Sequence, residues 1–234
     1  MARTMLAVVR EWLRDMGKNS MLWVMVLLPA GLSWAVLHAG GSAEQPFSAL
    51  WLVFAQLMTG LMLSSGHWLE EREQGTWQAL RLSPVPVGWL LFAQAFLLSL
   101  VTLASELLVF LADRGSAPLT LPLALYALFG AALATAIGVL IGIGGRSART
   151  GSMISTVVML VLFLGAVTAP GLKSYTALHA LLGWLPSVLS LSALDAGLAG
   201  SFAATQTNLA LGLWFLVVMS ATGFLLRRQY VEGR

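Results

Sequence analysis

Long apolar runs are the feature that most constrains the fold of this chain. Each run has roughly the 20 residues that a helix needs to cross the hydrocarbon core of a bilayer. Only 10% of the residues are charged, whereas a soluble domain carries about 25%. Within lipid, a helix pairs all its own backbone groups. The sequence therefore predicts an all-α integral membrane protein. The predicted spans are 21–38, 49–69, 88–112, 119–143, 152–169 and 209–226.

The segment before the first run, residues 2–18, has the period of an amphipathic helix. Its apolar side chains fall on one face, and its basic and acidic side chains fall on the other. A helix of this kind lies in the membrane interface with its basic side toward the lipid headgroups. The polar leader is too long for the start of a signal peptide, so we do not expect cleavage.

Residues 172–206 are apolar enough to suggest a seventh span, but Gly183 and Pro186 divide them. Each half has about 10 residues, a length typical of re-entrant or interfacial pieces. With six spans and a cytoplasmic N-terminus, 11 of the 13 Lys and Arg residues lie in the cytoplasm, as the positive-inside rule requires. The sequence predicts one domain, residues 1–234, with six spans and both termini in the cytoplasm. The cytoplasmic set is Arg3, Arg10, Arg14, Lys18, Arg72, Arg81, Arg146, Arg149, Arg227, Arg228 and Arg234.

A polar stretch at residues 70–86, EEREQGTWQALRLSPVP, separates the second and third spans. It begins with four adjacent ionisable residues, Glu70, Glu71, Arg72 and Glu73. Four neighbouring charges cannot lie in hydrocarbon, so the stretch must lie outside it.

The rest of this stretch has the signals of a helix end followed by a second, short helix. Gly75 is expected to end the second span's helix in a left-handed conformation, and Thr76 to cap the new helix. Trp77 and Leu80 share the apolar face of that turn, and Pro84 stops it. The sequence thus predicts a short helix lying across the membrane surface.

The stretch runs from an acidic cluster through Gly-Thr and a Leu-rich turn to Ser-Pro-Val-Pro, after which a new span begins. This order of features resembles the first cytoplasmic loop of ABC exporter permeases of the second type. The resemblance implies that this loop is a coupling helix docking on a separate ATP-binding subunit. It also implies an extracytoplasmic re-entrant element in residues 172–206. The loop is similar as well to that of the haem-exporter B subunits of cytochrome c maturation. The implied coupling residues are Glu71, Glu73, Gly75, Thr76, Trp77, Leu80 and Pro84.

As an assembly, the resemblance implies two permease copies, identical or homologous, above two ATP-binding subunits in the inner (plasma) membrane. The chain itself would be a transport subunit, not an enzyme. The substrate stays open among drugs, peptides, lipids and haem. The alternatives are a membrane-embedded enzyme and a non-transporting anchor subunit.

Glu106 is the ionisable residue well inside a predicted span. A carboxylate there costs roughly 2–3 kcal/mol or more unless it is paired, hydrated or protonated. It shares a helical stripe with Ser99 and Thr102, which favours a position facing the bundle. The three residues are candidates for a substrate pathway, and a structural hydrogen-bonding role for Glu106 is the alternative.

The fourth predicted span carries a small residue at every fourth position: Gly130, Ala134, Gly138 and Gly142. Such a ladder lets a neighbouring helix approach closely. Packing within the chain is the simpler interpretation, and a contact between subunits is the alternative.

Several kinds of chemistry have no signal in the sequence. The phosphate-binding loop needs a lysine in the frame G-x-x-x-x-G-K-[ST], and neither Lys18 nor Lys173 has it. There is no cysteine, and His38, His67 and His179 share no ligand spacing. Basic residues are scattered, so no nucleic acid is expected as a partner. We expect no cofactor or metal in this chain, with any ATP bound by the partner subunit.

Overall fold

The computed structural model describes residues 10, 14, 17–39, 48–75, 87–114, 118–145, 147–172 and 176–232. Most of the predicted interfacial helix, 2–18, and the loop residues Thr76, Trp77, Leu80 and Pro84 lie outside the described residues.

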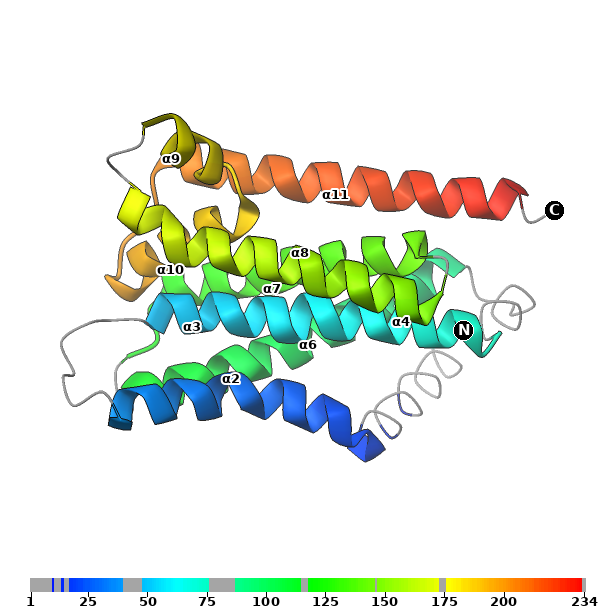
Figure 1. The fold of residues 1–234 in the computed structure, drawn as a ribbon, viewed down its shortest axis with the longest axis horizontal. Coiled ribbons are helices and arrows are strands. Elements are labelled where there is room, and N and C mark those ends of the chain that lie inside the picture. Colours follow the sequence, from blue (N-terminus) through cyan, green and yellow to red (C-terminus); the bar gives the residue numbers. More distant parts are fainter. Residues whose placement is uncertain are drawn as a thin grey trace.

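Helices make up nearly all of the described part, as the apolar runs predicted (Figure 1). Within the described ranges, six helical segments are long and apolar enough to cross a membrane, and each contains or closely overlaps one predicted span. The helices are α2 (Ser20–Ala39), α3 (Ser48–Ala55), η1 (Gln56–Leu63), α4 (Ser64–Glu73), α6 (Val87–Arg114), α7 (Leu121–Gly144), α8 (Ala148–Thr168), η2 (Ala169–Leu172), α9 (Thr176–Leu182), α10 (Pro186–Leu198) and α11 (Thr205–Glu232).

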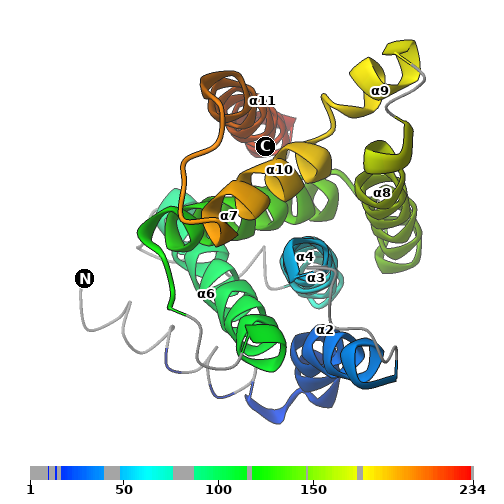
Figure 2. The same ribbon diagram turned by 90° about the vertical axis from the view of Figure 1, so that its left-hand side faces the viewer.

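The second span, Ser48–Glu73, is the centre of the bundle. It is built from α3, η1 and α4 in line, and α2, α6, α7 and α8 surround it (Figure 2). In its most apolar 18-residue stretch 67% of the residues are buried, against 17% in α11 at the periphery. Large apolar side chains on the outer helices, such as Trp23, Val157 and Leu216, are exposed. Their exposure is expected where lipid tails cover the protein.

Close packing of α7 against this central span explains the ladder of small residues. A Cβ atom added at Gly138 would overlap the carbonyl oxygen of Leu61, and one at Gly142 would overlap Trp68. One at Gly60, on the opposite helix, would lie 2.9 Å from Cβ of Ala134. The ladder therefore serves a contact within the chain, the simpler of the two interpretations.

The described part of the 172–206 region forms two short helices, α9 and α10, and neither is long enough to span a bilayer. The break falls at the predicted residues: α9 ends before Gly183, and α10 begins at Pro186. α10 packs into the bundle, where Ser187 Oγ donates to the carbonyl of Leu162 at 2.6 Å. α9 stays outside, with Leu181 70% exposed.

The ends of the bundle differ in what they hold. α2 begins and α11 finishes at one end, together with the end of α4 and the turn between α7 and α8 (Figure 1). We call this the α4 end. α9, α10 and the start of α11 lie at the other end (Figure 1). At that far end Thr120 caps α7, accepting from the amide of Leu123 and donating to the carbonyl of Gly197 at 2.6 Å.

Candidate functional site

The charged run at the end of α4 finishes the helix as the sequence predicted. Gly75 has φ +71°, the left-handed conformation that glycine adopts most readily. Its amide donates to the carbonyl of Arg72 at 3.2 Å, and the amide of Gln74 donates to the carbonyl of Glu70 at 2.9 Å. The chain therefore turns sharply at Gly75, before the loop that follows.

Arg72 and Glu73 bind the turn between α7 and α8. Nη1 of Arg72 donates to the carbonyl of Ile143 at 3.1 Å and to that of Gly145. Oε1 of Glu73 accepts from the amide of Ala148, in the first turn of α8, at 2.6 Å. A cation thus lies at the carbonyl end of α7 and an anion at the amide end of α8, the charges that helix dipoles favour. We call these two residues and their contacts the α7–α8 clamp.

Glu71, directly before these two residues, points inward. It is 7% exposed, and Nε2 of Gln94 donates to its Oε1 at 2.8 Å. Nε2 of His67 lies 3.3 Å from the same oxygen and also contacts Gln94. Oε2 of Glu71 has no hydrogen-bond partner. Of the predicted coupling residues that are described, Glu71 and Glu73 thus contact the bundle itself, and Gly75 forms the turn.

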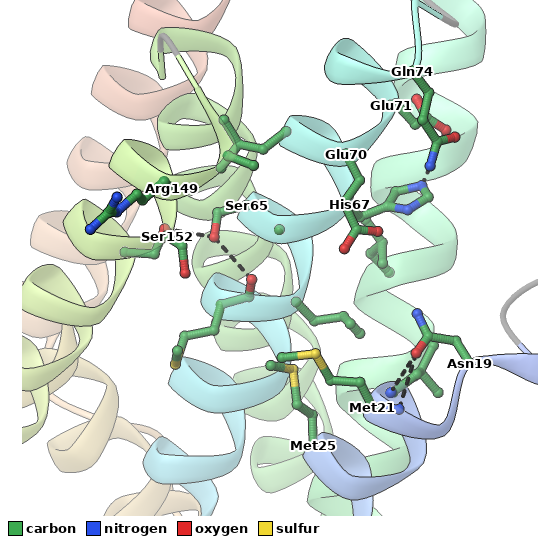
Figure 3. Close-up of a pocket in the computed structure, with 18 residues that line it drawn as sticks. Asn19, Met21, Met25, Ser65, His67, Glu70, Glu71, Gln74, Arg149 and Ser152 are labelled. Carbon is green, nitrogen blue, oxygen red and sulfur yellow. Dashed lines mark hydrogen bonds and ion pairs between the residues drawn. The ribbon is translucent and has the colours of Figure 1, made fainter.

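A cleft of about 680 Å³ opens beside this cluster. Its walls come from the start of α2, the α4 segment, α6 and the start of α8 (Figure 3). One wall carries His67, Glu70 and Glu71, and the facing wall carries Arg149 and Ser152 (Figure 3). Met21, Met25 and Met62 also line it. The cleft therefore combines polar and charged groups with flexible apolar side chains.

The predicted pathway stripe faces the interior of the bundle. Ser99, Thr102 and Glu106 are 7%, 0% and 2% exposed. The hydroxyls of Ser99 and Thr102 donate to carbonyls of their own helix, those of Ala95 and Leu98, each at 2.9 Å. Such bonds satisfy a hydroxyl without a second helix. Glu106 differs, because neither of its carboxylate oxygens has a hydrogen-bond partner.

Gln56, on the central span, is the polar side chain that approaches Glu106. It is 3% exposed, and its Nε2 also lacks a hydrogen-bond partner. The side chain lies over Gly130 of α7, where any Cβ would collide with it. Three helices thus meet at an amide nitrogen and a carboxylate that have no hydrogen-bond partner in the described structure, which is rare for buried groups.

Gln56 is also the first residue of a π-helical stretch, Gln56–Leu63, inside the span. Such segments are rare and occur frequently at functional sites. Within it Thr59 Oγ1 donates to the carbonyl of Met25 on α2 at 3.2 Å. Neither the π-helical stretch nor Gln56 was predicted from the sequence. A glutamine inside a predicted span was the one signal for the latter.

The three histidines lie apart, as their spacing suggested. His38 Nδ1 contacts the carbonyl of Trp34, and His179 Nδ1 contacts that of Ala169. His67 contacts Gln94 and Glu71. In the described ranges no group of three His, Cys, Asp or Glu residues is placed to hold a metal ion.

Together, the α4 end offers a cleft with charged walls, an internal clamp on the α7–α8 turn and the attachment point of the 76–86 loop. The membrane-embedded part offers an unsatisfied carboxylate and amide. The cleft is within the size range of small-molecule sites. No protein-family model and no curated protein matches this chain.

Proposed function

We propose that this chain is the transmembrane permease subunit of an ATP-driven ABC exporter of the second type. A separate ATP-binding subunit would dock on the 76–86 loop, and the α4 end would face the cytoplasm of the inner (plasma) membrane. Two permease copies, identical or homologous, would pair in the bilayer and move a substrate outward.

The observation that carries this proposal is the α7–α8 clamp. A partner that pulls on the 76–86 loop displaces the end of α4, which lies directly before it. Arg72 and Glu73 hold that end to the last carbonyls of α7 and the first turn of α8. A docking event outside the membrane would therefore reach two spans through charge-assisted hydrogen bonds, which are stronger than neutral ones.

The cleft supports the same direction of transport. At about 680 Å³ it is within the size range of small-molecule sites. It opens at the end where Lys18, Arg72 and Arg149 lie, the end that the positive-inside rule assigns to the cytoplasm. Access from the cytoplasm next to a coupling element suits an alternating-access exporter.

Co-purification with ATP-binding proteins encoded by adjacent genes tests this function. The chain alone is expected to show no ATP turnover, and the complex is expected to hydrolyse ATP. Trp77→Ala combined with Leu80→Ala should abolish recovery of the ATPase, because an aromatic anchor costs about 2 kcal/mol or more when truncated at an interface.

Leu181→Ala with Trp184→Ala is the matched control. It removes an exposed leucine and tryptophan with the same spacing, 70% and 62% exposed, at the other end of the bundle. It should recover as much ATPase as the unaltered chain. ATP hydrolysis by the purified chain alone, or equal recovery with the Trp77/Leu80 double variant, would exclude the proposed coupling.

A further inference from the structure

An apolar crevice of about 320 Å³ lies between α6 and α7, with Leu52 of α3 beside it. Among the described residues that line it, every side chain but one is apolar. The exception is Glu106, whose two carboxylate oxygens have no hydrogen-bond partner. One acidic group therefore belongs to an otherwise hydrocarbon-like site.

A carboxylate in such surroundings is costly unless another charge compensates it. Gln56 approaches it from the central span, but an amide carries no charge and cannot compensate the carboxylate. A ligand that brings one positive charge next to Glu106 would be stabilised more here than in water, because the attraction is not screened. Charge complementarity thus selects a cation.

The crevice opens on the outside of the bundle, where lipid tails cover the protein. Its rim residues Leu107, Leu119 and Leu128 are 49%, 57% and 47% exposed, whereas Phe110 and Leu123 on its walls are buried. A molecule reaching Glu106 by this route comes from the bilayer, so it must be apolar enough to dissolve there. Glu106 itself lines the crevice, so a ligand that enters it meets this side chain.

We propose that the α6–α7 crevice is a binding site for lipophilic monovalent cations, with Glu106 as the counter-charge. The ligand has an apolar body that fills the crevice and one delocalised or ammonium-type positive charge. Binding itself is independent of any ATP-binding subunit. The identification of this ligand class with the exported substrate rests on the function proposed above.

Equilibrium binding of radiolabelled tetraphenylphosphonium to the full chain in lipid nanodiscs tests the site, with empty nanodiscs as the background. We expect saturable binding by the unaltered chain. Glu106→Gln should weaken it at least about tenfold, because the buried counter-charge is lost. Glu106→Asp keeps the charge and should retain part of the affinity. Triphenylphosphine oxide, an uncharged analogue, should not displace the cation.

Two further variants separate the site from general effects on folding. Ala127→Phe fills the crevice while leaving the carboxylate in place, and it should also abolish saturable binding. Leu216→Phe, at a lipid-exposed position on α11, and Asp195→Asn, on α10, should bind as the unaltered chain does. Circular dichroism and size-exclusion profiles establish that each variant is folded.

Equal binding by the unaltered chain and Glu106→Gln would overturn the proposal, as would displacement by the uncharged analogue. Equal binding would mean that the Glu106 carboxyl group is not a counter-charge. Displacement by the uncharged analogue would mean that the crevice is an unselective lipid groove. Neither result bears on the ATP-binding partner, which the recovery experiment tests separately.

Discussion

Arg72 and Glu73 are neighbours in the sequence, yet they bind the ends of two different helices. Both side chains are exposed, and their partners are backbone groups 71 to 75 residues further along the chain. Surface ion pairs contribute little to stability, but a charged side chain bound to free helix-end groups contributes more. The residues that looked like a solvated charge cluster are therefore part of the tertiary structure.

Arg72→Ala should loosen the turn between α7 and α8. The change removes the guanidinium donor from the carbonyls of Ile143 and Gly145, at an expected cost of about 1–2 kcal/mol. Thermal unfolding should shift to lower temperature, and amide exchange should quicken around residues 147–151. Arg149→Ala, at an exposed position in the same region, should change neither quantity measurably. Unchanged exchange in the Arg72 variant would contradict the clamp.

At the scale of elements, the central span and α7 decide the packing. Gly138 and Gly142 place α7 directly on η1 and α4, with backbone or Cβ atoms of the neighbour where a side chain would be, and Gly130 faces the end of the Gln56 side chain. In lipid such close contact replaces the hydrophobic effect as the force that holds helices together. The central span and α7, packed in this way, position both the Gln56–Glu106 region and the cleft at the α4 end.

Gly138→Ala tests this contact, because its new Cβ atom would meet the carbonyl oxygen of Leu61, which is backbone and cannot rotate away. We expect a loss of about 1–3 kcal/mol of stability. Gly212→Ala is the matched control in α11, where a Cβ meets nothing within 4 Å. It should be neutral or slightly stabilising. A denaturation series in mixed micelles compares the two, and equal midpoints would contradict the close approach.

The sequence was sufficient to predict the spans, the break at Gly183 and Pro186, and the turn at Gly75, because each follows from local apolarity or backbone conformation. It was also sufficient to predict which face of α6 is buried. The partners of Arg72, Glu71 and Glu73 could not be predicted, since they depend on how distant helices pack. The π-helical stretch at Gln56–Leu63 has no local signature either. The role of Thr76, Trp77, Leu80 and Pro84 in coupling stays a prediction.

At the scale of the whole molecule, α2 begins and α11 finishes at the same end of the bundle (Figure 1). The α4 end holds the cleft, the clamp and most of the described basic residues. α9 and α10 occupy the other end, where α10 packs into the bundle and α9 remains exposed. The two ends are thus chemically distinct, and the positive-inside rule orients them: the α4 end toward the cytoplasm.

That orientation can be measured directly, because the chain has no cysteine. Three variants each carry a single cysteine, which is then the one thiol of the chain. Ser201→Cys lies at the end with α10, and Ser147→Cys and Glu232→Cys lie at the α4 end. In intact cells a membrane-impermeant maleimide should label Ser201→Cys and should leave Ser147→Cys and Glu232→Cys unlabelled. Opening the cells should expose the last two, which serves as the control for reactivity. Labelling of Glu232→Cys from outside would put the C-terminus on the opposite side. The cleft would then face outward, and both the six-span orientation and the export direction derived from it would be wrong.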